Sequence, residues 1–378
     1  MQFSEEQILI RDMARNFAQS ELAPRAAEWE DKSEFAPGVL EAMGELGLMG
    51  MCIPEEWGGA GTDFVSYALA IEEIAAGWAS ASTVMSVNNS PVCSALLEYG
   101  SPDQKSRYLM PLAQGAIACF CLTEPHTGSD AGAIKTRAEK VGDGYRINGT
   151  KQFITSAAIA EHALIFAITD PDAGSRGMSA FIVPTATDGF NVIAKEKKLG
   201  QRAADTCQVA FDNMEVSADQ LVGEEGQGYR IALANLEAGR VAVAAQAVGI
   251  ARAAFEAATA YANERKTFGT EIINHQAVAF RLADMATQLE AARQLVLHTA
   301  RLRDDGIACI AEASMAKLFA SEAAEKICTD AIQIHGGYGY VEGFPVERLY
   351  RDVRICQIYE GTSDVQRMVI ARGFVDKG

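Results

Sequence analysis

The sequence lacks the excess of positive charge that a general nucleic-acid or anionic-membrane surface needs. Across its 378 residues, 33 Lys and Arg face 50 Asp and Glu, which gives a formal net charge of -17. Polyanionic partners select surfaces rich in Lys and Arg. The composition therefore argues against nucleic-acid binding, and a phosphate-bearing ligand would need a local basic cluster.

The sequence also lacks membrane-span and targeting signals. No apolar run reaches the length of a membrane span, and residues 1–6 are acidic rather than a basic targeting segment. We therefore expect a soluble protein in the cytoplasm. A processed mitochondrial matrix protein is the alternative.

Metal-ligand clusters are missing as well. Eight Cys are scattered through apolar segments, and Cys119 and Cys121 form a C-x-C pair with no second cluster of Cys or His. On a strand these two side chains are expected to point to opposite faces. We expect no metal site and reduced, buried thiols in a reducing compartment.

A dinucleotide-binding parallel sheet is not expected, because no βαβ alternation occurs and no G-x-G-x-x-G follows a strand. The sequence instead predicts an α+β protein with an N-terminal helical domain, a middle antiparallel β sheet or barrel, and a C-terminal four-helix bundle. The predicted boundaries are 1–117, 118–225 and 226–378.

Periodicity and turn signals support this division. Capping boxes at Ser4 and Ser101 and a long apolar helix over 64–87 define the first domain. In the middle, turn dipeptides at 143–144 and 148–149 separate short β-rich runs. Three Ala-rich patterns then run over 229–264, 275–304 and 307–334. The fourth bundle helix is predicted after Glu360, and apolar outer faces favour an oligomer.

The stretch Gln357-Ile358-Tyr359-Glu360-Gly361-Thr362-Ser363 places one carboxylate on a tight turn between apolar residues. Ser363 and Gln366 have the spacing of a capping box, so Glu360 is expected just before a helix start. Such a carboxylate is placed to meet a ligand. Taken alone, the turn is far more typical of a surface Glu in a loop.

Three further stretches favour a bound ligand. The loop over 120–132 is rich in hydroxyls and Gly and offers backbone N–H groups to a planar polar ligand or a phosphate; an ordinary turn is the alternative. Residues 263–269 close a helix with two cations and an aromatic ring, which suits a diphosphate or simply the helix dipole. Residues 333–340 end a helix with adjacent glycines. His335 within them is expected to be structural.

These pieces together resemble the acyl-CoA dehydrogenase family of flavoproteins over essentially the whole chain. Six motifs occur in the family's order, and they are Leu122-Thr123-Glu124-Pro125 to Gly128-Ser129-Asp130, Asn148-Gly149-Thr150-Lys151 with Phe153-Ile154-Thr155, Glu264-Arg265-Lys266-Thr267-Phe268-Gly269, His275-Gln276, Gln333 to Gly337, and Tyr359-Glu360-Gly361-Thr362-Ser363.

The resemblance implies FAD-dependent oxidation of an acyl-CoA to the trans-2-enoyl-CoA, a step of fatty acid β-oxidation. Glu360 would abstract the Cα proton while flavin N5 accepts the Cβ hydride, and electrons would pass to an electron-transfer flavoprotein. The Glu360 backbone N–H and a flavin ribityl hydroxyl would hold the enolate oxygen. Burial should raise the pKa of Glu360 towards neutrality against the opposing effect of the helix start.

The cofactor residues follow from the motifs by the same resemblance. Those expected at the flavin ring are Phe120, Leu122, Thr123, Gly128, Ser129, Phe153, Ile154 and Thr155, with Thr362, Ser363 and Asp364 at the helix mouth. Those expected at the pyrophosphate and adenosine are Arg265, Phe268 and Gln276, with Gln333, Gly336 and Gly337 of a neighbouring subunit. Family members usually carry Trp where Phe153 stands, so stacking is kept and an indole N–H contact is lost. A flavin shared between subunits implies an oligomer, in this family typically a homotetramer.

The substrate-contacting positions that match the family are Ser129, Glu237, Arg240 and Gly361, and Arg240 is a candidate partner for CoA. The position of Glu360 favours straight short- or medium-chain acyl groups. Residues 86–90 resemble short-chain members, whereas 200–206 and 264–269 resemble medium-chain ones. Short branched acyl groups, an acyl-CoA oxidase and a catalytically silent acyl-CoA-binding protein are the alternatives.

Overall fold

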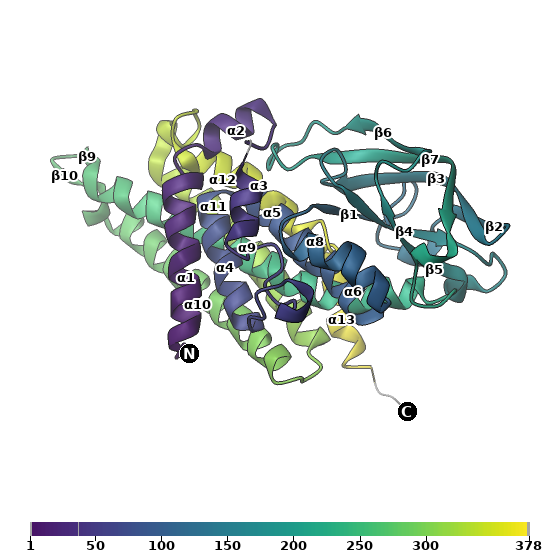
Figure 1. Cartoon of the computed structure of the whole chain (residues 1–378). Helices are drawn as coiled ribbons and strands as arrows, with labels where there is room; N and C mark the ends of the chain where they lie inside the picture. The colour runs from purple at the N-terminus through teal and green to yellow at the C-terminus, as the bar shows by residue number, and fades with distance from the viewer. Residues whose placement is uncertain (1, 37, 376–378) are drawn as a thin grey trace.

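The computed structural model describes residues 2–36 and 38–375. Met1 and residues 376–378 of the predicted terminal domains lie outside the described residues. The strands of the middle domain gather at one end of the molecule and the long helices at the other, where the short strands β9 and β10 also lie (Figure 1). This helical, β and helical order confirms the predicted architecture.

Short helices and one buried helical hairpin form the N-terminal part. Its helices are α1 (Glu5–Phe17), η1 (Ala18–Leu22), α2 (Ala26–Lys32), α3 (Val39–Glu45), η2 (Glu55–Trp57), α4 (Phe64–Gly77), α5 (Ala79–Val87), η3 (Asn88–Cys93), α6 (Ser94–Tyr99), α7 (Pro102–Gln104), η4 (Lys105–Leu109) and α8 (Met110–Ala113). The capping boxes predicted at Ser4 and Ser101 are both present.

The single helix predicted over 64–87 is wrong, because Trp78 interrupts it. Trp78 adopts an extended backbone with φ -159° and ψ 111° between α4 and α5. Its indole Nε1 donates a 2.8 Å hydrogen bond to the buried Glu30 carboxylate. The tertiary position of Glu30 therefore selects a break that the continuous apolar pattern does not predict.

The middle domain is an eight-stranded sheet in the order β6-β7-β3-β2-β4-β5-β8, with β1 paired to β4. Its strands are β1 (Ala118–Cys121), β2 (Arg137–Val141), β3 (Gly144–Thr155), β4 (His162–Ile168), β5 (Met178–Pro184), β6 (Phe190–Lys195), β7 (Thr206–Ser217) and β8 (Leu221–Val222), with short 3-10 turns η5 (Ala131–Ala133), η6 (Gly174–Gly177) and η7 (Ala218–Gln220).

The sheet departs from the antiparallel prediction in two places. Strands β1 and β2 both pair with β4 in parallel, so the sheet is mixed. Asn148-Gly149 is not a turn but a register shift inside the long strand β3. A Cβ on Gly149 would lie 2.4 Å from the Thr136 hydroxyl, so close strand approach explains this glycine.

The opposite-face prediction for Cys119 and Cys121 is also wrong. Residues two apart on a strand share a face, and the two Sγ atoms on β1 lie 3.7 Å apart, both buried. All eight Cys are free thiols, as predicted. Among residues 2–36 and 38–375, no group of three His, Cys, Asp or Glu is arranged to hold a metal ion.

The C-terminal part is built around one long helix, α9. Its elements are α9 (Gly228–Glu264), β9 (Lys266–Thr267), β10 (Thr270–Glu271), η8 (Ile272–Asn274), α10 (Gln276–Asp304), α11 (Ile310–His335), η9 (Gly336–Gly339), α12 (Pro345–Val353), η10 (Arg354–Gln357) and α13 (Ser363–Arg372). The sequence interpretation did not anticipate α12.

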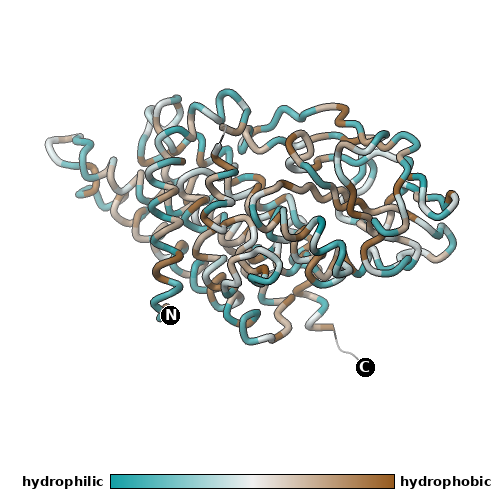
Figure 2. Tube along the Cα trace, viewed as in Figure 1, coloured by the Kyte–Doolittle hydropathy of each residue, from teal (hydrophilic) through white to brown (hydrophobic). Residues whose placement is uncertain are grey.

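Helix α9 packs against α4, α10 and α11, so the N-terminal domain completes the helical layer. Within the described part of the chain, α9 is the one helix long and apolar enough to cross a membrane, but 72% of its apolar window is buried in the protein. Hydrophobic stretches occur both on the helices and along the strands of the middle domain (Figure 2). We interpret α9 as a core helix.

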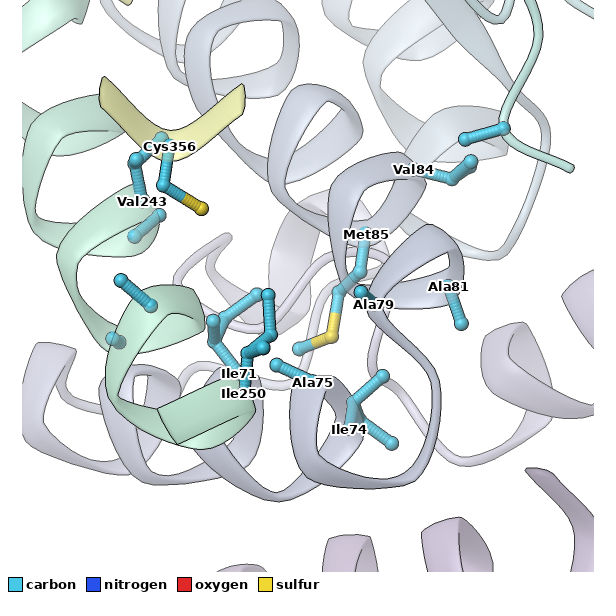
Figure 3. Close-up of a cluster of buried hydrophobic side chains, with 14 of the residues drawn as sticks. Ile71, Ile74, Ala75, Ala79, Ala81, Val84, Met85, Val243, Ile250 and Cys356 are labelled. Atoms are coloured by element: carbon cyan, nitrogen blue, oxygen red, sulfur yellow. The ribbon is translucent and has the colours of Figure 1, made fainter. Parts of the chain in front are cut away.

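The core joins the domains rather than filling each one separately. Ile71 of α4 lies beside Ile250 of α9, Met85 of α5 points towards Ala75 of α4, and Val243 of α9 lies beside Cys356 (Figure 3). Small residues on α9 allow this close approach: a Cβ on Gly249 would lie 2.2 Å from the Glu72 carbonyl oxygen. The helices thus form a rigid wall against which the β domain stands.

Candidate active site

A cavity of about 1100 Å³ lies between the β domain and the C-terminal helices. Its sheet wall is lined by Phe120, Leu122, Thr123, Gly128, Ser129, Phe153, Ile154 and Thr155, all predicted at the flavin ring. Its helical wall carries Arg240, Glu360 and Gly361, also predicted. The fold therefore brings together residues more than 200 positions apart in the chain.

Glu360 lies on a turn with unusual backbone geometry. Glu360 has φ +54° and Gly361 has φ +86°, so two consecutive residues adopt left-handed conformations. For Glu this conformation costs free energy and persists only when the surroundings hold it. Glycine at the second position avoids the penalty that any Cβ would add.

The capping prediction at this turn is wrong by one residue. Thr362, not Ser363, is the N-cap of α13, and its side chain accepts from the Val365 N–H. Gln366 points back to the turn instead, and its Nε2 donates to the carbonyl oxygens of Glu360 and Gly361. Glu360 still precedes the helix start, as predicted.

The Glu360 carboxylate is poorly hydrogen-bonded. Its Oε2 is buried and has no hydrogen-bond partner among the described residues. Gly239 of α9 makes room for it, because a Cβ there would lie 2.0 Å from Oε2. Burial raises the pKa of Glu360 to about 7, while Lys317 and Arg240 oppose the rise. Burial within the protein alone therefore already outweighs these two cations, and the additional effect of a bound acyl chain and flavin stays a prediction.

A second buried carboxylate, Glu124, lies behind the sheet wall and does not line the cavity. It accepts from Lys151 Nζ at 2.9 Å and from the amides of Lys135 and Thr136. Burial raises the pKa of Glu124, but Lys151 and the amide donors outweigh burial and leave the pKa below its ordinary value. Lys151 also donates to the Leu122 carbonyl. This pair fixes the loop that carries Thr123, Gly128 and Ser129.

Arg240 and Glu237 have different surroundings on α9. Arg240 is buried and lines the cavity; its Nη1 donates to Ser314 at 3.3 Å, and its Nε has no partner within the described chain. Burial lowers the pKa of Arg240. Glu237 does not line the cavity, and its carboxylate pairs with Arg303 at 2.7 Å. In this geometry Arg240 is available to a ligand and Glu237 is already engaged.

The residues predicted for the adenosine side lie elsewhere. Arg265, Gly336 and Gly337 line a second cavity of about 430 Å³ with Tyr261 and His335. The predicted residues Phe268, Gln276 and Gln333 are exposed to solvent, and Phe268 is 99% exposed at φ +54°. His335 bonds the Ala331 carbonyl and stacks on Tyr261, which supports its structural interpretation.

Some cavity residues were missed, and three predicted ones are not on its wall. Thr362, Ser363 and Asp364 do not line the cavity; Ser363 Oγ is buried without a partner and Asp364 is solvent-exposed. Two of the missed lining residues, Tyr229 and Arg372, are polar. Most of the others are apolar, among them Val87, Pro91, Leu233, Leu236, Ile310, Val365, Met368 and Val369. Their helical spacing is that of ordinary core residues, so no signal in the sequence separates them.

The sheet wall fits a flat aromatic group with polar edges. The Phe153 ring is 62% exposed, and its φ of +59° is a strained conformation for a bulky residue. The Thr123 and Thr155 side chains lie on the same cavity wall. An apolar cavity with a few convergent polar groups is typical of a cofactor site.

This site and fold define an enzyme class in which a buried carboxylate faces a cofactor pocket. Comparisons with known proteins are specific. Models of the acyl-CoA dehydrogenase N-terminal, middle and C-terminal domains match residues 4–116, 119–214 and 226–375. The chain belongs to the acyl-CoA dehydrogenase family. It is accordingly a flavoprotein oxidoreductase with FAD as its cofactor, and it catalyses acyl-CoA dehydrogenation.

Individual relatives match this chain over nearly its full length. The chain is 49% identical over 373 residues to an acyl-CoA dehydrogenase of Bacillus subtilis (strain 168), covering 98% of each. It is 46% identical over 364 residues to the mitochondrial short-chain specific acyl-CoA dehydrogenase of Bos taurus, covering 96% of this chain and 88% of that protein. The butyryl-CoA dehydrogenase structure from Megasphaera elsdenii matches with a TM-score of 0.97 and 38% identity, covering 100% of both chains.

Proposed function

We propose that the enzyme oxidises straight short- to medium-chain acyl-CoA thioesters to trans-2-enoyl-CoA, with Glu360 as the base. The observation that carries the proposal is the buried, unpartnered Glu360 carboxylate facing the predicted flavin wall. A base whose pKa is near 7 is well matched to proton abstraction at neutral pH. Similarity to short-chain relatives supports the acyl range.

The chain's own residues divide the work. Glu360 takes the Cα proton, and the cavity's apolar helical wall excludes water from the acyl chain. The Glu360 backbone N–H holds the thioester oxygen as negative charge develops on it. Bound FAD supplies the acceptor for the Cβ hydride. The substrate thereby loses one proton to the protein and one hydride to the cofactor.

For substrate binding we propose Ser129, Arg240 and Gly361, which line the cavity. Arg240 brings a buried cation with an unused Nε donor. Glu237 stays a weaker candidate, because its carboxylate pairs with Arg303. A direct role of Glu237 would require that pair to open.

For the cofactor we propose a flavin bound across two subunits of a homotetramer. Within one chain, the ring-side residues line the large cavity, and Arg265, Gly336 and Gly337 line a separate one. The exposed Phe268 is an apolar surface that a neighbouring subunit would cover. Thr362, Ser363 and Asp364 remain predicted flavin contacts. An electron-transfer flavoprotein as acceptor and a cytoplasmic location also remain predictions.

An anaerobic acyl-CoA series tests the proposal. The purified protein should be yellow, and butyryl- to octanoyl-CoA should bleach its flavin faster than long-chain or short branched acyl-CoAs. Faster bleaching by isobutyryl- or 2-methylbutyryl-CoA would replace the substrate proposal with the branched one. A flavin that no acyl-CoA reduces would identify a catalytically silent binding protein. Rapid reoxidation by O2 would identify an oxidase.

A further inference from the structure

Lys317 of α11 is a buried lysine beside the Glu360 turn. It is 1% exposed, and its Nζ donates to the carbonyl oxygen of Tyr359 at 2.7 Å and to that of Gly361. No carboxylate lies within salt-bridge distance of Nζ among the described residues. A buried ammonium normally requires an ionic partner, so its use on two loop carbonyls needs an explanation.

The Tyr359 carbonyl belongs to the peptide that precedes Glu360, and the Gly361 carbonyl belongs to the peptide between Gly361 and Thr362. Gln366 donates to the carbonyls of Glu360 and Gly361, so all three consecutive carbonyls at 359–361 are held from inside the protein. In a trans peptide the N–H points opposite to the C=O. Because the Tyr359 carbonyl faces Lys317, the Glu360 N–H is directed away from Lys317. That N–H has no acceptor within the described chain.

We propose that Lys317 is the positioning residue of the catalytic turn: its ammonium fixes the Tyr359 and Gly361 carbonyls, keeps Glu360 in its left-handed conformation and directs the Glu360 N–H towards the substrate oxygen. This inference rests on the proposed function of Glu360. Lys317 acts only through the turn, so it is not itself a catalytic residue.

The charge of Lys317 has a second consequence. The charged and titratable groups around the turn are Tyr67 from α4, Arg240 from α9, Lys317 from α11, and Tyr359 and Cys356 from the chain before Glu360. Of these, Lys317 and Arg240 favour the ionised carboxylate against burial. Burial lowers the pKa of Lys317 itself to about 8, and Glu360 opposes that fall. Loss of the Lys317 charge should therefore raise the pH at which Glu360 ionises.

The variant Lys317→Met keeps the length of the side chain and removes the donors and the charge. Lys326→Met on the same helix is the matched control, because Lys326 is exposed and pairs only with Asp330 on the surface. The readout is exchange of the α-proton of a 3-thia-acyl-CoA in D2O. This analogue allows deprotonation without hydride transfer, so exchange reports the turn and the base separately from turnover.

We expect K317M to slow α-proton exchange by about 10- to 100-fold and to shift the acid limb of the pH–rate profile to higher pH. Its flavin content and its affinity for the analogue should stay nearly unchanged. K326M should match the wild type. If K317M exchanges the α-proton at the wild-type rate and its acid limb lies at the wild-type pH, the proposal is overturned and Lys317 is a packing residue.

If K317M does not fold or loses FAD, Lys317→Gln decides, because it retains amide donors but no charge. A raised acid limb in K317Q supports the proposal, and an unmoved limb overturns it. Failure of the wild type itself to exchange with any acyl-CoA analogue counts against the proposed function instead. The two failures are therefore distinguishable.

Discussion

A buried lysine and a buried glutamate lie at or behind each wall of the cavity, and the two pairs are used in opposite ways. On the sheet wall, Lys151 bonds directly to Glu124, and the pKa of Glu124 falls below its ordinary value. On the helical wall, Lys317 bonds to backbone carbonyls and leaves Glu360 Oε2 unpartnered, so burial raises the pKa of Glu360 to about 7. The first arrangement fixes a loop, and the second keeps a base reactive.

The difference lies in hydrogen bonds rather than in residue type. Each donor to a carboxylate stabilises its ionised form and makes it a weaker base. Glu124 has three donors and Glu360 Oε2 has none. The absence of hydrogen-bond donors to Oε2 among the described residues therefore distinguishes Glu360, the proposed base, from the structural Glu124.

The largest expected effect follows from removing the base. Glu360→Gln should slow flavin reduction by about 10²- to 10⁴-fold, because the amide cannot accept the Cα proton, while FAD remains bound. Stopped-flow absorbance under anaerobic conditions measures this rate. Glu322→Gln on the exposed face of α11 is the control. Rapid bleaching by E360Q would exclude Glu360 as the base.

Breaking the sheet-wall pair should affect stability instead of chemistry. Lys151→Met leaves Glu124 buried without its cation and should cost about 3–5 kcal/mol in the free energy of unfolding. Chemical denaturation measures the loss. The exposed Lys140→Met, whose partner is Glu225, should change stability by about 1 kcal/mol or less. A stable K151M protein would mean that the sheet-wall pair is dispensable.

The raised pKa of Glu360 also predicts a pH dependence of stability. The folded pKa of about 7 lies above the ordinary value of 4.5, so the stabilisation is fully present below pH 4.5 and is lost as the pH rises through 7. At pH 8, E360Q should therefore be more stable than the wild type by up to about 3 kcal/mol.

That stability difference should vanish near pH 4.5, where the wild-type carboxyl is neutral. Denaturation of substrate-free protein across pH 4–8 measures it. In the same pH range, kcat/KM of the wild type should rise with an acid limb near 7. Equal stability of the two proteins at pH 8 would show that the Glu360 carboxylate is well solvated.

The smallest effect is expected at Glu237. Because Glu237 pairs with Arg303 at the edge of the site, Glu237→Gln should change stability by about 1 kcal/mol or less. The KM for acyl-CoA should stay within about threefold, since 1.4 kcal/mol corresponds to tenfold in affinity. Steady-state kinetics measures it. A KM increase above tenfold would restore the substrate-binding role that the resemblance implies.

Much of this architecture was predictable, because its signals are local. Capping boxes at Ser4 and Ser101, Ala-rich periodicity over the long helices and β-rich runs between turns identified the three-part order. Two of the errors arose where a distant partner overrides local preference. Trp78 breaks a helix to reach Glu30, and Gly149 allows one strand to pass Thr136 instead of turning.

By itself the sequence determined which residues we propose for the chemistry, because the motif around Glu360 and the loop at 120–130 are contiguous. Only the tertiary structure decided how they work. The space that Gly239 leaves for the Glu360 carboxylate and the hydrogen bond from Lys317 to the Tyr359 carbonyl come from helices far away in the chain. A pKa depends on burial and on donors within a few ångströms, and those distances exist only after the chain has folded.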